Sequence, residues 1–243
     1  MLETLPGPVV FAHRGSSADA PENTLSAFKL AVNQGAKAIE LDVQLSADQS
    51  VIVFHDSSVD RVTDGSGKIK NLSSQLLKEL DAGAAFSPKF SGEKIPTLEE
   101  VFDSIDSNIL INIELKNLTS PFDNLPELVT ELIKKHHAEN QVLISSFNPI
   151  SLMKFKELNP TIPIGRLLHN PISIFCFSRF PGMSVNYRSI HLPLTSVNPT
   201  RVRAFHQLRK FVFTYTLNNA QDILHALDCG VDGFFTDKPD AAK

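Results

Sequence analysis

Four short runs of the sequence combine histidine, carboxylate and cationic side chains at the ends of apolar segments. They are His13-Arg14-Gly15, Glu40-Leu41-Asp42, His55-Asp56 and Glu114-Leu115-Lys116. Each run follows or interrupts a short, β-rich segment that is typical of a strand. These residue types suit acid–base chemistry and the binding of a metal ion or a phosphate, provided that the fold brings the strand ends together.

The carboxylates have the spacing of a metal site. Glu40 and Asp42 are two residues apart, so on a strand both side chains point to one face. Like charges on an inward face are costly unless a cation or protons neutralise them. With Glu114 they make a site of hard oxygen ligands that suits Ca2+ or Mg2+. Because histidines are nearby and histidine is a common zinc ligand, Zn2+ remains an alternative ion. The alternative is a set of internal salt bridges, such as Glu114 with Lys116.

Two of the eight histidines end predicted strands next to these carboxylates. Hydrolysis of a phosphodiester needs a base for the attacking oxygen and an acid for the leaving alkoxide, and His13 and His55 suit both roles near neutral pH. His169 and His191 also lie at or in predicted strands and could approach the same site. The other histidines fall on predicted helices and are interpreted as surface residues: His136, His137, His206 and His225.

Arg14 and Lys116 complete the candidate site. A guanidinium and an ammonium can stabilise the charge that builds up on phosphate oxygens during reaction. The alternative for Arg14 is a structural ion pair with Glu40 or Glu22.

Strand-like and helix-like segments alternate along the whole chain, which favours an α/β fold with a parallel sheet. The predicted strands span residues 9–13, 38–43, 51–55, 109–115, 142–147, 162–168, 188–192, 211–217 and 233–236. The predicted helices span residues 23–34, 98–105, 126–136, 149–158, 199–208 and 219–227. Asn23 is the predicted N-cap of the first helix, and Gly35 its C-terminal stop.

The loop between the second and third predicted strands decides the architecture. Residues 44–50 are too few for a parallel crossover, so residues 51–55 should return antiparallel as a hairpin. The other eight strands then form a (β/α)8 TIM barrel, with no domain boundary within residues 1–243. Residues 57–96, with a possible helix at 73–80, form an insertion, and we expect this insertion to form one wall of the substrate site. Its predicted apolar anchors are Phe86, Phe90 and Ile95.

Composition excludes some classes of protein. The chain has 243 residues, 42% hydrophobic and 21% charged, with a net charge of -4 and a pI of about 6.1. Without a basic stripe, nucleic acid is not an expected partner. The N-terminus lacks a signal peptide pattern and no apolar run is long enough to span a membrane, so a cytoplasmic protein without membrane insertion is expected. Cys176 and Cys229 are interpreted as free buried thiols. The oligomeric state stays open.

Seven segments, in order along nearly the whole chain, resemble the glycerophosphodiester phosphodiesterase family. They read FAHRGSSADAPENTLSAF, AIELDVQLSADQSVIVFHD, RVTDGSG, INIELK, LISSFNP, YTLNN and GVDGFFTDKPD. The resemblance implies a β/α barrel with an insertion after the second strand, and a bound Ca2+ or Mg2+. It implies that His13 and His55 act as acid and base. It also implies that the metal ligands are Glu40, Asp42 and Glu114, and that Arg14 and Lys116 contact the phosphate.

The chain departs from the family pattern at Tyr215, where the family usually has Trp. We expect this ring to line the alcohol side of the substrate pocket. Two smaller departures, Gln49 in the hairpin turn and Val62 in RVTDGSG, do not touch the candidate site.

The expected function is metal-dependent hydrolysis of glycerophosphodiesters, such as glycerophosphocholine or glycerophosphoethanolamine, to sn-glycerol 3-phosphate and an alcohol. Water or a glycerol hydroxyl can be the nucleophile, and either histidine can be the base. One alternative is a lysophospholipase D-like activity on acylated diesters, for which residues 172–180, with Met183, are the candidate apolar groove. Another is a catalytically inactive barrel used as a binding domain, which predicts the loss of a histidine or a carboxylate from the set.

Overall fold

A closed ring of parallel strands organises the protein. The computed structural model describes residues 7–169 and 186–242, and within them one sheet has nine strands. The strands are β1 (Val9–His13), β2 (Ala38–Leu45), β3 (Val51–Val53), β4 (Leu110–Leu115), β5 (Val142–Ser146), β6 (Ile164–Leu167), β7 (Ser189–Pro193), β8 (Phe211–Tyr215) and β9 (Gly233–Thr236). Pairing of β1 with β2 and with β9 closes the barrel, while β3 pairs antiparallel with β2. The predicted barrel with a hairpin extension is therefore confirmed.

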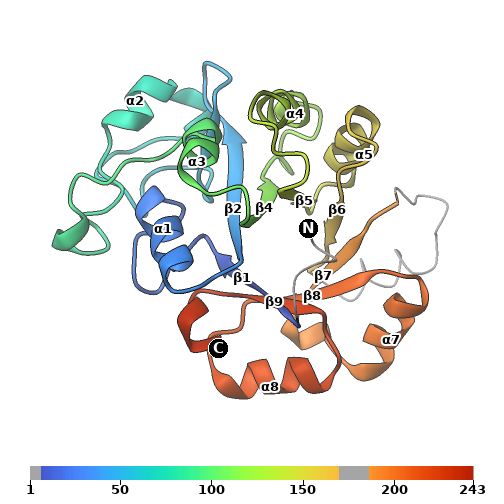
Figure 1. Cartoon of the computed structure of the whole chain (residues 1–243). Helices are drawn as coiled ribbons and strands as arrows, with labels where there is room; N and C mark the ends of the chain where they lie inside the picture. Colours follow the sequence, from blue (N-terminus) through green and yellow to red (C-terminus); the bar gives the residue numbers. More distant parts are fainter. Residues whose placement is uncertain (1–6, 170–185, 243) are drawn as a thin grey trace.

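Helices surround the ring of strands (Figure 1). They are α1 (Leu25–Asn33), α2 (Ser74–Glu79), α3 (Leu98–Ser104), α4 (Leu125–Lys135), α5 (Pro149–Leu158), α7 (Pro199–Gln207) and α8 (Ala220–Asp228). Phe28 of α1, Val129 of α4 and Phe155 of α5 are fully buried in the apolar layer between helices and strands. Most predicted boundaries lie within about two residues of these, the usual uncertainty of helix and strand ends.

The predicted N-cap of α1 is wrong by one residue. Thr24 has the extended backbone of an N-cap, and its side chain accepts a hydrogen bond from the amide of Ala27. Asn23 instead adopts φ 57°, a conformation that Asn tolerates better than most residues, and its side chain bonds Asp42. Gly35, with φ 90°, follows the helix as predicted.

The barrel interior combines aromatic and polar side chains. The ring of Phe11 stacks on Phe235 and meets the edge of Phe213, at centroid distances of 4.7 and 5.1 Å. The interior also holds the buried polar residues Asn112 and His191, and the imidazole of His191 lies 5.2 Å from the Phe235 ring between centroids. The interior is therefore not uniformly apolar, and polar groups can be presented at the C-terminal ends of the strands, where barrel active sites lie.

His191 should make stability depend on pH. Its imidazole is fully buried, 2.9 Å from Ser189 Oγ, and burial lowers its pKa to about 3. Between about pH 6.5 and pH 3 the unfolded chain binds a proton here that the folded chain does not. Because of this residue, the free energy of unfolding should decrease as the pH falls, by about 2 kcal/mol between pH 7 and pH 5.

Urea unfolding at both pH values measures this effect. In His191→Asn the decrease in unfolding free energy between pH 7 and pH 5 should be smaller than in the wild type. Equal decreases in the two proteins would mean that His191 does not cause it.

The insertion of residues 57–96 is folded and has an apolar cluster of its own. Ile52 and Phe54 of the hairpin pack there against Val59, Ile69 and Ile95. Of the predicted anchors, Ile95 is buried, Phe90 is half-buried, and Phe86 is 44% exposed and thus no core residue. Figure 1 places α2 and its flanking loops beside α1 and α3. The insertion therefore packs against the hairpin through apolar contacts.

Candidate active site

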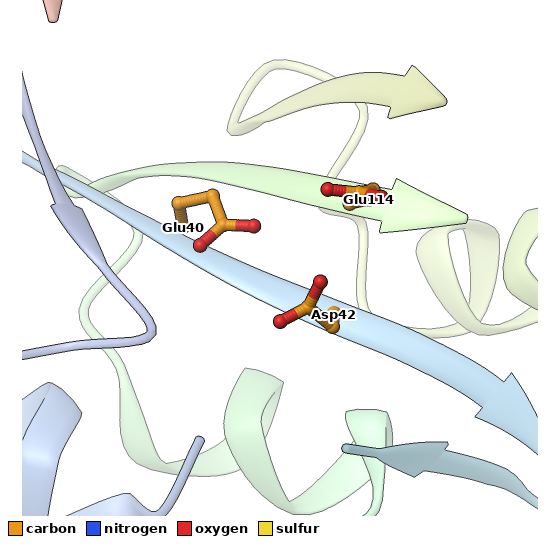
Figure 2. Close-up of side chains that lie close together, drawn as sticks. All are labelled: Glu40, Asp42 and Glu114. Atoms are coloured by element: carbon orange, nitrogen blue, oxygen red, sulfur yellow. The ribbon is translucent and has the colours of Figure 1, made fainter. Parts of the chain in front are cut away.

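Three carboxylates from two neighbouring strands meet at the mouth of the barrel. Glu40 and Asp42 lie on β2, and Glu114 lies opposite Asp42 on β4. Each offers an oxygen within 4.8 Å of the others (Figure 2). Glu40 and Asp42 are almost completely buried. The two-residue spacing on β2 and the parallel register therefore produce the predicted cluster.

Neighbouring cations neutralise this cluster only in part. Lys116 Nζ lies 3.1 Å from Glu114 and 3.6 Å from Asp42, so the predicted internal salt bridge is present. Burial opposes ionisation of Asp42, but Lys116 and Arg14 outweigh it and lower the pKa of that carboxyl. Burial and the charge of Asp42 raise the pKa of Glu40, and raise that of Glu114 to about 7. Three oxygen donors with excess negative charge fit a hard divalent cation.

His13 is held by an aspartate from the other end of the chain. Its Nδ1 lies 2.7 Å from Asp237, which also accepts hydrogen bonds from Ser17 and Asn218. Closure of the barrel brings the ends of β1 and β9 together, across 224 residues of sequence. The sequence analysis did not predict Asp237 as a partner of His13. The predicted closure of the barrel could have indicated it, because closure places the last strand next to the first.

A tight backbone turn follows His13. Gly15 has φ 85°, and a Cβ at this position would lie 2.6 Å from the backbone of Ala27. Only glycine fits so close to α1. Arg14 has φ 57°, and its amide donates to Glu40 at 3.0 Å. The turn therefore links the first histidine to the carboxylate cluster.

His55 has a similar aspartate partner, adjacent in sequence. Its Nδ1 lies 2.7 Å from Asp56, which accepts a bond of 2.5 Å from Arg61 Nε of the insertion. Gln44 donates to the carbonyls of Phe54 and Asp56 and so fixes the loop that carries the histidine. Burial, together with the nearby cations, lowers the pKa of His55. Asp56 belongs to the predicted HD run, but its role as a partner was not predicted.

Arg14 and Tyr215 both have protein partners. The guanidinium of Arg14 donates to Glu22 at 2.9 Å, and its Nε lies 3.3 Å from Asp42, so the predicted alternative of an ion pair with Glu22 is present. Tyr215 donates its hydroxyl to the carbonyl of Leu168 at 2.8 Å. Because this hydrogen bond occupies the hydroxyl, Tyr215 can contact a ligand with its aromatic ring.

One pocket of about 180 Å³ brings the predicted residues together. Seven of the eight line it: His13, Arg14, Glu40, His55, Glu114, Lys116 and Tyr215. Asp42 lies behind this surface within the carboxylate cluster. Phe147 and His191 also line the pocket, whereas His206 and His225 lie on helices outside the barrel and His136 is the C-cap of α4. A parallel barrel with such a pocket at the C-terminal ends of its strands has the architecture of a barrel enzyme.

Known proteins with this architecture match nearly the whole chain. Residues 13–241 match the model of the glycerophosphoryl diester phosphodiesterase family. A glycerophosphodiester phosphodiesterase from Caldanaerobacter subterraneus subsp. tengcongensis is 39% identical over 236 residues, which are 96% of this chain and 95% of the relative. One from Bacillus altitudinis is 36% identical over 239 residues, 96% of each chain. A solved phosphodiesterase from Oleispira antarctica, in complex with the product sn-glycerol-3-phosphate, has a TM-score of 0.90 at 33% identity and covers 97% of this chain and 95% of its own.

The chain therefore belongs to the glycerophosphoryl diester phosphodiesterase family, and it is an enzyme of the phosphoric diester hydrolase class. Among the described residues, no helix is long and apolar enough to cross a membrane. Cys229 is a buried free thiol as predicted, while Cys176 lies outside the described residues.

Proposed function

We propose that this enzyme hydrolyses glycerophosphodiesters to sn-glycerol 3-phosphate and an alcohol, with a divalent cation, Ca2+ or Mg2+, as cofactor. The observation that carries the proposal is one pocket lined by two aspartate-held imidazoles and by the carboxylate cluster. The activity for which the relatives are named and the product bound in the Oleispira antarctica structure agree with it.

The two histidines divide the proton transfers. In each, Nδ1 is bound to an aspartate, and within the part of the chain that the structure describes Nε2 has no partner. Asp237 and Asp56 fix the ring orientation, which leaves Nε2 to exchange a proton. One of His13 and His55 removes a proton from the attacking oxygen, and the other protonates the leaving oxygen of the alcohol.

The remaining residues bind the phosphate and the organic part of the substrate. A cation held by Glu40, Asp42 and Glu114 would supply positive charge to the phosphate oxygens. Arg14 and Lys116 add a guanidinium and an ammonium beside the same cluster. Tyr215, whose ring centroid lies 6.3 Å from that of Phe147, forms an aromatic wall against the substrate carbons.

Release of sn-glycerol 3-phosphate from glycerophosphocholine tests the activity and the cofactor together. We expect release by the enzyme as purified, loss of at least about 90% of it in EDTA, and recovery when Ca2+ or Mg2+ is added back. A parallel addition of Zn2+ tests the third ion that imidazoles and carboxylates can bind. Full activity in EDTA would remove the cation from the mechanism, and no release from any glycerophosphodiester with any of the three ions would refute the activity.

The two alternatives gain no support. The stretch on which a lysophospholipase D-like activity depends, residues 172–180 with Met183, lies outside the described residues. An inactive barrel predicts the loss of a histidine or a carboxylate, but all five residues are present and lie together.

A further inference from the structure

A second, larger hollow opens directly from the candidate active site. It has a volume of about 530 Å³ and shares His55, Glu114, Lys116 and Phe147 with the smaller pocket. Tyr215, Arg14 and His13 line only the smaller pocket. His55 and Lys116 therefore lie between two different spaces, and a phosphate bound beside them would have one space for each side of a diester.

The hollow is a groove between the hairpin with its insertion and the loop that follows β4. Gln49, Lys68 and Lys70 line one wall, and Leu118 and Thr119 line the other. We call it the lysine groove after Lys68 and Lys70. These five residues come from segments outside the barrel ring, so this part of the lining can differ between barrels that keep the same site.

The two lysines stand on a fixed piece of backbone. Between them Ile69 is fully buried in the cluster of the insertion, and its amide donates to the carbonyl of Ser57 at 3.1 Å. The amide of Ala47 in the hairpin donates to Leu72 at 2.9 Å, which ties this segment to the hairpin. Lys68 and Lys70 are themselves exposed, so their ammonium groups are available while their backbone is held.

The outer part of the groove has excess positive charge. Within the described ranges, neither Lys68 nor Lys70 has an ion pair or a side-chain hydrogen bond. The lining has three lysines, the third being Lys116, against two carboxylates, Glu114 and Asp123. Glu114 is paired with Lys116 at 3.1 Å, and Asp123 accepts a hydrogen bond from the side chain of Asn117 at 2.6 Å. A ligand that extends along the groove thus meets two unpaired cations.

We propose that the lysine groove binds the alcohol side of the substrate, and that Lys68 and Lys70 favour alcohols that carry their own carboxylate or phosphate. The assignment rests on the proposed function. The glycerol side is the same small group in every glycerophosphodiester and suits the 180 Å³ pocket, whereas alcohols of different sizes need the open groove. Tyr215 then lies beside the glycerol, not on the alcohol side as expected from the sequence.

Glycerophosphoserine and glycerophosphoethanolamine form a matched substrate pair, because they differ by one carboxylate. We expect the wild type to have the higher kcat/KM on glycerophosphoserine. The double variant Lys68→Gln, Lys70→Gln should lower the ratio of the two kcat/KM values by roughly threefold to tenfold, in line with exposed charge pairs. The double variant Lys68→Arg, Lys70→Arg should keep the ratio, as should Lys29→Gln, which removes an exposed lysine on α1.

Salt provides an independent readout. Raising the ionic strength from about 0.05 M to about 0.5 M should reduce the wild-type ratio and leave that of the double glutamine variant almost unchanged, because salt screens exposed charges. An unchanged ratio in the double glutamine variant, with sn-glycerol 3-phosphate still released from both substrates, would refute the role of Lys68 and Lys70. It would leave the proposed function intact. No release from either substrate by the wild type would instead refute the proposed function.

Discussion

Replacement of His13 or His55 by alanine is expected to lower kcat for glycerophosphocholine by about 10²- to 10⁴-fold. Each change removes one proton-transfer group, while the three carboxylates and the two cations beside them stay in place. Binding of the divalent cation should therefore persist. The measurement is the steady-state rate of sn-glycerol 3-phosphate release, combined with titration of Ca2+ or Mg2+ into each variant.

His206 provides the matched control for this experiment. It also pairs with an aspartate, Asp232, at 2.8 Å, but it lies on α7 away from the pocket. His206→Ala should keep a rate within about twofold of the wild type. A near-normal rate in His13→Ala or in His55→Ala would remove that histidine from the mechanism. Loss of cation binding in either variant would show that the imidazole also supports the metal site.

Glu114→Gln is expected to have opposite effects on the free and the cation-bound protein. Burial and the charge of Asp42 raise the pKa of Glu114 to about 7, so the stability linked to its protonated form is present below about pH 4.5 and lost as the pH rises through 7. At pH 8 in EDTA the wild type thus retains a repulsion that the variant lacks, and the variant should melt at the higher temperature.

Addition of the cation should reverse this order. At about 100 times its Kd a ligand stabilises a protein by about 2.7 kcal/mol, which raises Tm by roughly 5–10 °C for a chain of this size. We expect this increase for the wild type with Ca2+ or Mg2+, and less than half of it for Glu114→Gln.

The control for Glu114 is Glu157→Gln, which removes an exposed carboxylate on α5. Its melting temperature should match that of the wild type in EDTA and with the cation. Equal cation-induced shifts in the wild type and Glu114→Gln would contradict ligation by Glu114. A lower melting temperature of Glu114→Gln in EDTA would mean that its ion pair with Lys116 outweighs the repulsion.

Much of the fold follows from local sequence, because strands and helices impose short periods. The seven residues between the predicted strands 38–43 and 51–55 are too few for a crossover, and this alone indicated a hairpin outside an eight-stranded barrel. Side chains on a strand alternate between its two faces, and this two-residue period placed Glu40 and Asp42 on one face. Local sequence misled where a side chain has a distant partner: Asn23 resembles an N-cap, but its side-chain amide donates to Asp42 on β2.

The sequence by itself determined which strand ends carry the candidate residues and which of them share a face, since side-chain direction on a strand repeats every two residues. Only the tertiary structure decided their partners. Asp237 reaches His13 because β9 lies next to β1, and Arg61 reaches Glu22 because the insertion folds back to the loop that precedes α1. Barrel closure also buries His191, and packing of the insertion on the hairpin leaves Lys68 and Lys70 facing a groove. Such contacts depend on the packing of segments far apart in the chain, which local periodicity does not encode.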